Sequence, residues 1–302
     1  MSRQKSATGR TFKRWVLRPI TGAAVWPLYW FLRLLPLDPA SWLGGAVAHT
    51  IGPWLSVSRR AADNLRRCFP EKDEAEITEI LAEVWDNLGR VAGEYAHLDE
   101  FDVSGNDPRV ELVGLEHLEA VRDDGAPGIF FSAHLANWEI LSLGATAHGL
   151  PLTRIYREMN SPLAEKLLRR GVSPVAGDLV PKGRVGAMAL NRAMKADGHI
   201  ALMVDQKLNE GIELPFFGRP AMTAPALASF ALKYRCPVVP TRVERLGGAR
   251  FRATIYPPME LPDSGDREAD TRVLMTQVNQ IVEDWVRERP GQWFWLHRRW
   301  RD

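Results

Sequence analysis

The sequence contains little cysteine and lacks the common motifs of metal and nucleotide sites. Cys68 and Cys236 are the only two cysteines among 302 residues, and they do not form a CxxC pair. This argues against a disulfide framework or a cysteine-based zinc site and fits a reducing compartment. A glycine-rich phosphate loop and a Gly-x-Ser-x-Gly elbow are also absent from the sequence. We therefore expect neither a metal nor a cofactor.

The first 37 residues contain seven Lys or Arg and no Asp or Glu. A basic arm before an apolar stretch is typical of a segment that meets an anionic bilayer surface, and a solvated tail is the alternative. The apolar stretch Ile20–Leu32 contains Pro27 and is shorter than the roughly 20 residues of a spanning helix. We predict that residues 1–57 form a basic tail and membrane-anchoring interfacial helices. A single tilted transmembrane helix is the alternative.

The remainder of the chain, residues 58–302, is predicted to be one α/β domain with a mostly parallel central sheet flanked by helices. The net charge of +2 gives no reason to expect a nucleic-acid partner. From about residue 108, short β-rich runs alternate with helical ones, which is typical of such a sheet. The expected strands are 128–133, 153–156, 199–204, 238–243 and 250–256, and the expected helices are 59–68, 74–96, 138–148, 162–170, 186–196, 224–234 and 271–288.

The most informative segment is Ser132-Ala-His-Leu-Ala-Asn-Trp-Glu139, which joins an expected strand to an expected helix. Ligands of parallel sheets bind beyond the carboxyl ends of the strands, so chemistry is expected here. With His134 in the loop and Glu139 in the first helical turn, the two side chains can meet. A carboxylate on one ring nitrogen leaves the other nitrogen free to accept a proton. We predict that His134 is a general base oriented by Glu139. Asn137 is expected to cap the helix.

This segment resembles the His-x-(Gly/Ala)-Asn-Trp-Glu motif of the lipid A biosynthesis acyltransferases, the late enzymes that add secondary acyl chains. Further blocks of the sequence match that family in order. They are Asn64–Glu71, Tyr156-Arg157, Asp205-Gln206, Pro215–Gly218 and Trp295–Trp300. A related glycerolipid acyltransferase family ends its motif in Asp, so Glu139 favours the lipid A type.

The resemblance implies that a fatty acyl group passes from an acyl carrier protein thioester to a hydroxyl of a lipid A precursor. The partners it implies are the carrier protein, the glycolipid acceptor and the cytoplasmic face of the bacterial inner membrane. The carrier's phosphopantetheine thioester is then the donor substrate, and no separate cofactor is implied.

Further residues receive expected roles in this reaction. Arg157, after an expected strand, is a candidate to stabilise the oxyanion or hold a phosphate, and Asp205 is a candidate to support the site. The acyl chain needs an apolar pocket, for which Phe131, Trp138 and Phe216 are candidates. The candidates for contact with a phosphorylated acceptor are Lys182, Arg184, Arg298 and Arg299.

Three alternatives remain open at this point. In the first alternative, the acceptor is another membrane glycolipid, such as a mannosylated phosphatidylinositol. In the second, the same base activates water, and the protein is a thioesterase. The third alternative is a membrane-binding protein without activity.

Overall fold

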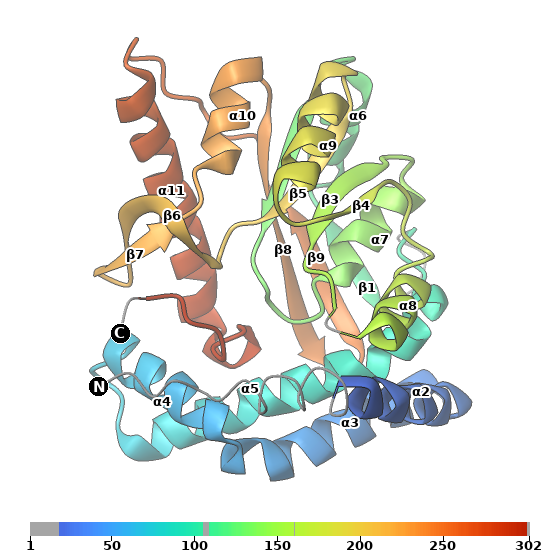
Figure 1. Ribbon diagram of the computed structural model, residues 1–302. Helices are drawn as coiled ribbons and strands as arrows, with labels where there is room; N and C mark the ends of the chain where they lie inside the picture. The colour runs from blue at the N-terminus through green and yellow to red at the C-terminus, as the bar shows by residue number, and fades with distance from the viewer. Residues whose placement is uncertain (1–17, 105–108, 160, 301–302) are drawn as a thin grey trace.

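The computed structural model describes residues 18–104, 109–159 and 161–300 (Figure 1). Most of the predicted basic arm, in residues 1–17, lies outside the described residues. The fold is a mixed α/β fold around a seven-stranded sheet in the order β1-β9-β8-β2-β5-β3-β4. Only the pairing of β8 with β9 is antiparallel within that sheet. The strands are β1 (Val110–Val113), β2 (Gly128–Ser132), β3 (Leu152–Tyr156), β4 (Leu179–Pro181), β5 (His199–Met203), β8 (Val238–Gly247) and β9 (Arg250–Ile255).

Helices cover both faces and one end of the sheet (Figure 1). They are α2 (Arg18–Leu34), α3 (Leu37–Ile51), α4 (Ser56–Cys68), α5 (Glu74–Glu94), α6 (Leu115–Asp123), α7 (Glu139–Ala147), α8 (Pro162–Gly171), α9 (Arg184–Lys195), α10 (Ala226–Tyr234) and α11 (Arg267–Glu288). Short 3-10 helices are η2 (Gly52–Trp54), η3 (Tyr95–Glu100) and η4 (Pro290–Gln292).

The alternation of side chains along β2 shows how the sheet separates two cores. Ile129 and Phe131 belong to the largest cluster, with α10 and α11, whereas Phe130 packs with α6 and α7 on the opposite face. All five residues of β2 are buried, as expected for a central parallel strand. The five strands predicted from the sequence are confirmed. The short β1 and β4 were missed because three or four residues give too weak a periodic signal.

The predicted membrane-anchoring region at the N-terminus was wrong. Among the described residues, no helix is both long and apolar enough to cross a bilayer. Instead, α3 packs closely along α5, and glycines make that approach feasible. A β-carbon on Gly44 would lie 2.2 Å from the carbonyl oxygen of Gly89, and one on Gly93 would lie 2.2 Å from that of Ala40. The glycines of this N-terminal region are thus explained by contact with a neighbouring helix.

A separate antiparallel hairpin, β6 (Lys207–Phe216) and β7 (Arg219–Thr223), follows β5. Its turn has positive φ at Phe217 (55°) and Gly218 (64°), as a type I′ turn requires. The carboxylate of Glu283 accepts the backbone N–H of Phe217 and holds this non-glycine residue in place. The Pro-Phe-Phe-Gly block of the sequence is therefore a hairpin turn.

Candidate active site

His134 occupies a short loop between β2 and α7, at the carboxyl edge of the sheet. The chain reverses sharply there, because Ala136 adopts a left-handed conformation with φ of 45°. The C-terminal segment holds the loop through two backbone hydrogen bonds. Ala136 N–H donates to the Gln292 carbonyl (2.9 Å) and Phe294 N–H donates to the His134 carbonyl (3.1 Å), which together make an antiparallel bridge between Leu135 and Trp293. The position of the imidazole thus depends on residues more than 150 positions later in the chain.

The carboxylate that contacts His134 is that of Asp205, which lies in the short connection between β5 and β6. Asp205 Oδ1 lies 2.7 Å from His134 Nδ1, and Oδ2 accepts the backbone N–H of His134 at 2.9 Å. The indole N–H of Trp293 also donates to Oδ2, at 2.8 Å. Because this carboxylate accepts from Nδ1, the imidazole presents Nε2 as its basic nitrogen. The amide nitrogen of Gln206 lies 3.4 Å from Nε2.

The electrostatics of the pair favour a charged imidazolium. Burial lowers the pKa of His134, but the neighbouring carboxylates of Asp205 and Glu139 outweigh burial and hold it above its ordinary value. Burial alone would raise the pKa of Asp205, yet His134 and His297 hold it far below its usual range. A site of this kind stabilises the proton once His134 has accepted it.

Glu139 begins α7 as predicted, but its ion-pair partner is Arg154, with Arg154 Nη1 and Glu139 Oε2 3.4 Å apart. Burial raises the pKa of Glu139, and it lowers that of Arg154. Among the described residues, the carboxylate hydrogen-bonded to His134 is thus Asp205, while Glu139 acts on the imidazole through space. Asn137 Oδ1 accepts the backbone N–H of Glu139 at 3.3 Å, but the N-cap residue of α7 is Trp138 and not Asn137 as predicted.

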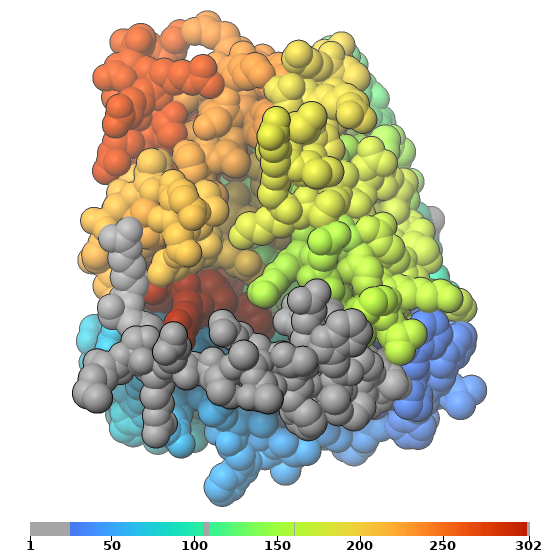
Figure 2. All heavy atoms as spheres, in the orientation of Figure 1, coloured from blue at the N-terminus to red at the C-terminus, as the bar shows by residue number. Residues whose placement is uncertain are grey.

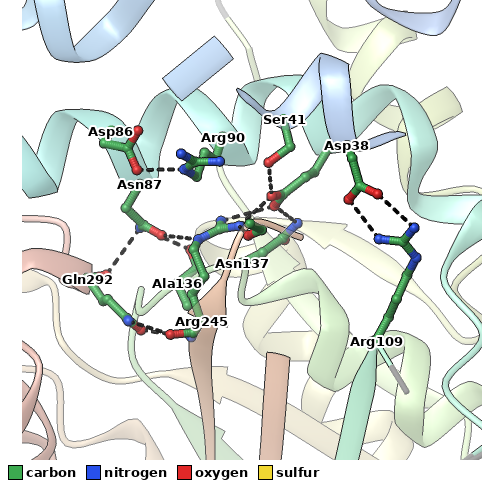
Figure 3. A network of polar contacts seen from close by, with 12 residues as sticks. Asp38, Ser41, Asp86, Asn87, Arg90, Arg109, Ala136, Asn137, Arg245 and Gln292 are labelled. Carbon is green, nitrogen blue, oxygen red and sulfur yellow. Dashed lines mark hydrogen bonds and ion pairs between the residues drawn. The ribbon is translucent and has the colours of Figure 1, made fainter. Parts of the chain in front are cut away.

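A second polar cluster lies behind the loop (Figure 3). It consists of five buried side chains, those of Ser41, Asn87, Glu94, Asn137 and Arg245. At its centre, Glu94 at the end of α5 forms a buried ion pair with Arg245 of β8. The same carboxylate accepts hydrogen bonds from Ser41 (2.7 Å) and from the side chain of Asn137 (3.0 Å). Asn87 accepts from Arg245 Nε at 2.9 Å. The Asn-Trp-Glu start of α7 is therefore fastened to α3, α5 and β8 at one point.

The remaining predicted residues lie in different surroundings. Arg157 is exposed just past β3, and Trp138 packs edge-on against the His134 ring, with centroids 5.1 Å apart. Phe131 stacks on Trp285, and Phe216 stacks on Trp300, both in the packed core. The pocket roles of these three aromatic residues stay predictions.

Of the expected acceptor-binding residues, Arg299 is buried away from the surface. It donates to the carbonyl of Met222 (3.1 Å) and the hydroxyl of Thr223 (2.9 Å), and burial lowers its pKa to about 10. By contrast, Lys182 and Arg184 are exposed.

The molecular surface is hollowed between the gold β6–β7 hairpin and the lime-green region of β3 and α8 (Figure 2). The deep-red C-terminal segment, which holds the loop of His134, lines the lower side of this hollow. Within the described ranges, no group of three or more His, Cys, Asp or Glu side chains is arranged to hold a metal ion. The site therefore contains an imidazole that Asp205 holds through Nδ1, with Nε2 as the nitrogen that can accept a proton.

Comparison with known proteins identifies the family. The model of the family described as bacterial lipid A biosynthesis acyltransferase matches residues 9–302. The chain belongs to this family. It is thus an acyltransferase, and the resemblance noted from the sequence is confirmed.

Curated relatives of the acyltransferase carry names in agreement with this. A lipid A biosynthesis acyltransferase of Haemophilus influenzae is 26% identical over 90% of this chain and 86% of its own length. The lipid A biosynthesis myristoyltransferase of Escherichia coli is 26% identical over 80% of this chain and 74% of its own. A phosphatidylinositol mannoside acyltransferase of Mycobacterium tuberculosis is 25% identical over 62% and 58%.

The structure brings together three blocks of this acyltransferase that are far apart in sequence. Phe69 contacts both Phe217 and Trp295, with ring centroids 5.5 Å and 5.8 Å apart. The indole of Trp300 donates to the carbonyl of Phe216 at 3.1 Å. The N-terminal block, the hairpin turn and the C-terminal tryptophans therefore form one aromatic cluster beside the site.

Several site residues of the acyltransferase were not singled out from the sequence. Asn87 and Glu94 lie on the apolar stripe of α5, at helical spacing from Ile80 and Val84, so polar groups at core positions were the available signal. Arg154 offered a similar signal, as a charge within a short apolar strand. For Trp293 the sequence contains no such signal, because its role depends on a carboxylate that is distant in the chain.

Proposed function

We propose that the protein transfers a fatty acyl chain from an acyl carrier protein thioester to a hydroxyl of a lipid A precursor. The observation that supports this best is the contact of His134 Nδ1 with Asp205 at 2.7 Å, which leaves Nε2 facing outward. A thioester is already activated, so the enzyme must supply a base, positioning and stabilisation of the oxyanion.

The proposed reaction proceeds in two proton transfers. The acceptor hydroxyl oxygen adds to the thioester carbonyl carbon while its proton passes to His134 Nε2. The tetrahedral intermediate then collapses, the carbon–sulfur bond breaks, and the imidazolium returns the proton to the leaving thiolate. The products are an ester and a free thiol, so His134 ends as it began.

Asp205 fixes the ring and stabilises the imidazolium, as the carboxylate of a catalytic triad does. Glu139 adds negative potential beside the same ring, since it too raises the pKa of His134. Arg157 is proposed to meet the oxyanion or an acceptor phosphate, because it is exposed at the carboxyl end of β3. The acceptor is a membrane lipid, so we place the reaction at the cytoplasmic face of the bacterial inner membrane.

The test uses purified protein, an acyl carrier protein thioester whose acyl chain is radiolabelled, and a lipid A precursor that carries its Kdo sugars. Acylated lipid in the wild-type reaction, and none with His134→Ala, is the expected result. Release of free fatty acid alone would instead indicate a thioesterase, and the absence of turnover would contradict both reactions.

A second acceptor is supported by the similarity to the mycobacterial phosphatidylinositol mannoside acyltransferase. A parallel reaction with a phosphatidylinositol mannoside compares the two acceptors under identical conditions. Faster acylation of the mannoside than of the lipid A precursor would favour this acceptor over the one proposed.

A further inference from the structure

The outer face of α9 combines positive charge with two exposed apolar side chains. Residues 182–195 contain four Lys or Arg and no Asp or Glu. Arg184, Met188 and Arg192 follow one another at intervals of four, so they share one face of the helix. Met188 is 57% exposed, and its neighbour Val185 is 65% exposed. The opposite face is buried against β3, β4 and β5.

The cations of this segment differ from those of the neighbouring α8. There, Arg169 pairs with Glu165 at 2.9 Å, and Lys166 and Arg170 lie over the rings of Trp26 and Trp30. Within the part of the chain that the structure describes, Lys182, Arg184, Arg192 and Lys195 have no acidic side chain within ion-pair distance. Their charge is thus not neutralised by the acidic side chains that the structure describes, and an approaching partner can contact it.

This face stands beside the candidate active site. The helix starts immediately after β4, at the carboxyl edge of the sheet, and the backbone N–H of Lys182 donates to the carbonyl of Tyr156 at 2.8 Å. The residues just before α9 are therefore joined to the strand end that carries Arg157. The helix also lies on the side of the molecule in which the hollow opens (Figure 2).

The chemistry of this face fits an acidic protein surface. Unpaired cations attract acidic side chains, and a flexible methionine adapts to an apolar contact at the centre. Large aromatic side chains, which favour lipid interfaces, are not among the residues of α9. We propose that the outer face of α9 docks an acidic surface of the carrier protein that delivers the thioester. This rests on the proposed function.

The test compares two matched double variants. Arg192→Glu/Lys195→Glu reverses two exposed charges on α9 and leaves Arg184, a candidate acceptor contact, in place. Arg59→Glu/Arg67→Glu reverses two exposed charges of α4, which lies at the opposite end of the molecule (Figure 1). Each protein is assayed with acyl carrier protein thioester and with the same acyl group on pantetheine, which lacks the protein surface.

The α9 variant should raise KM for the carrier-bound thioester about 10-fold or more at low salt, with kcat unchanged, because charge complementarity governs encounter. Its kinetics with acyl pantetheine should equal those of the wild type, and the α4 variant should resemble the wild type with both donors.

Three outcomes would overturn the docking proposal: an unchanged KM for the carrier, an equal loss with acyl pantetheine, or an equal loss in the α4 variant. Weaker sedimentation with anionic phospholipid vesicles, with no change in the carrier KM, would assign the face to a membrane and also overturn it. Failure of the proposed function is distinguishable, because the wild-type enzyme would then transfer the acyl group from neither donor.

Discussion

Two polar clusters flank the loop of residues 134–138, and they differ in how fully their atoms are used. Around Glu94 and Arg245, side-chain donors and acceptors pair with one another inside the protein (Figure 3). Around His134, Nδ1 lies 2.7 Å from Asp205, whereas the described residues give Nε2 a single long contact, of 3.4 Å with Gln206. The closed cluster holds the loop in position, and the open cluster leaves a ring nitrogen that the proposed mechanism uses as the base.

The largest effect is expected from breaking the closed cluster. Arg245→Met leaves the Glu94 carboxylate buried without its cation, which should reduce the free energy of unfolding by about 3–5 kcal/mol. Urea denaturation followed by circular dichroism measures the change. The double variant Glu94→Leu/Arg245→Met removes both charges and should recover much of the loss. A double variant no more stable than Arg245→Met would show that the pair itself is not the cause.

Removing the imidazole of the open cluster tests the other half of the comparison. His134→Ala should lower kcat by at least about 100-fold, the lower range for loss of a general base. Steady-state transfer assays measure it, and His49→Ala, an exposed histidine on α3, is the matched control. Full activity in the His134 variant would remove this residue from the mechanism.

The pH profile separates the two carboxylates near the imidazole. A base acts when deprotonated, and the pKa of His134 is raised, so kcat/KM should rise with pH through a value above 6.5. Asp205→Asn removes the larger of the two upward influences while burial still lowers the pKa, so the rising limb should move to lower pH. The plateau should fall by roughly 10-fold or more, since the ring loses its fixed orientation.

Glu139→Gln is the companion variant for this measurement. It should move the limb in the same direction but less, because Glu139 influences the ring without a hydrogen bond. If the rising limb of kcat/KM moves further with Glu139→Gln than with Asp205→Asn, Glu139 and not Asp205 is the main partner of His134.

The smallest effect concerns the joint between the clusters. Ala136 has a φ of 45°, which costs a non-glycine residue about 1 kcal/mol, and glycine avoids this strain but loses more entropy on folding. Ala136→Gly should therefore change the unfolding free energy by less than about 1 kcal/mol and leave kcat within about 2-fold. A large fall in kcat at unchanged stability would show that the β-carbon of Ala136 itself positions the site.

Local patterns in the sequence predicted the main strands and the place of His134, because a buried strand followed by a helix is encoded within a few residues. They did not predict that Asp205, rather than Glu139, contacts the ring, since that depends on how β2 and β5 pair. The N-terminal error has a similar origin. An apolar stretch rich in glycine has the same composition whether it meets lipid or α5, and only the helix pairing distinguishes the two.

The attachment of the His134 loop to Gln292, Trp293 and Phe294 has a consequence for biosynthesis. A nascent chain that has emerged from the ribosome only as far as α10 already contains His134 and Asp205, but not the indole and backbone groups that hold them. Catalytic competence should therefore arise late in translation, and a chain truncated before residue 292 should be inactive even where its sheet has formed.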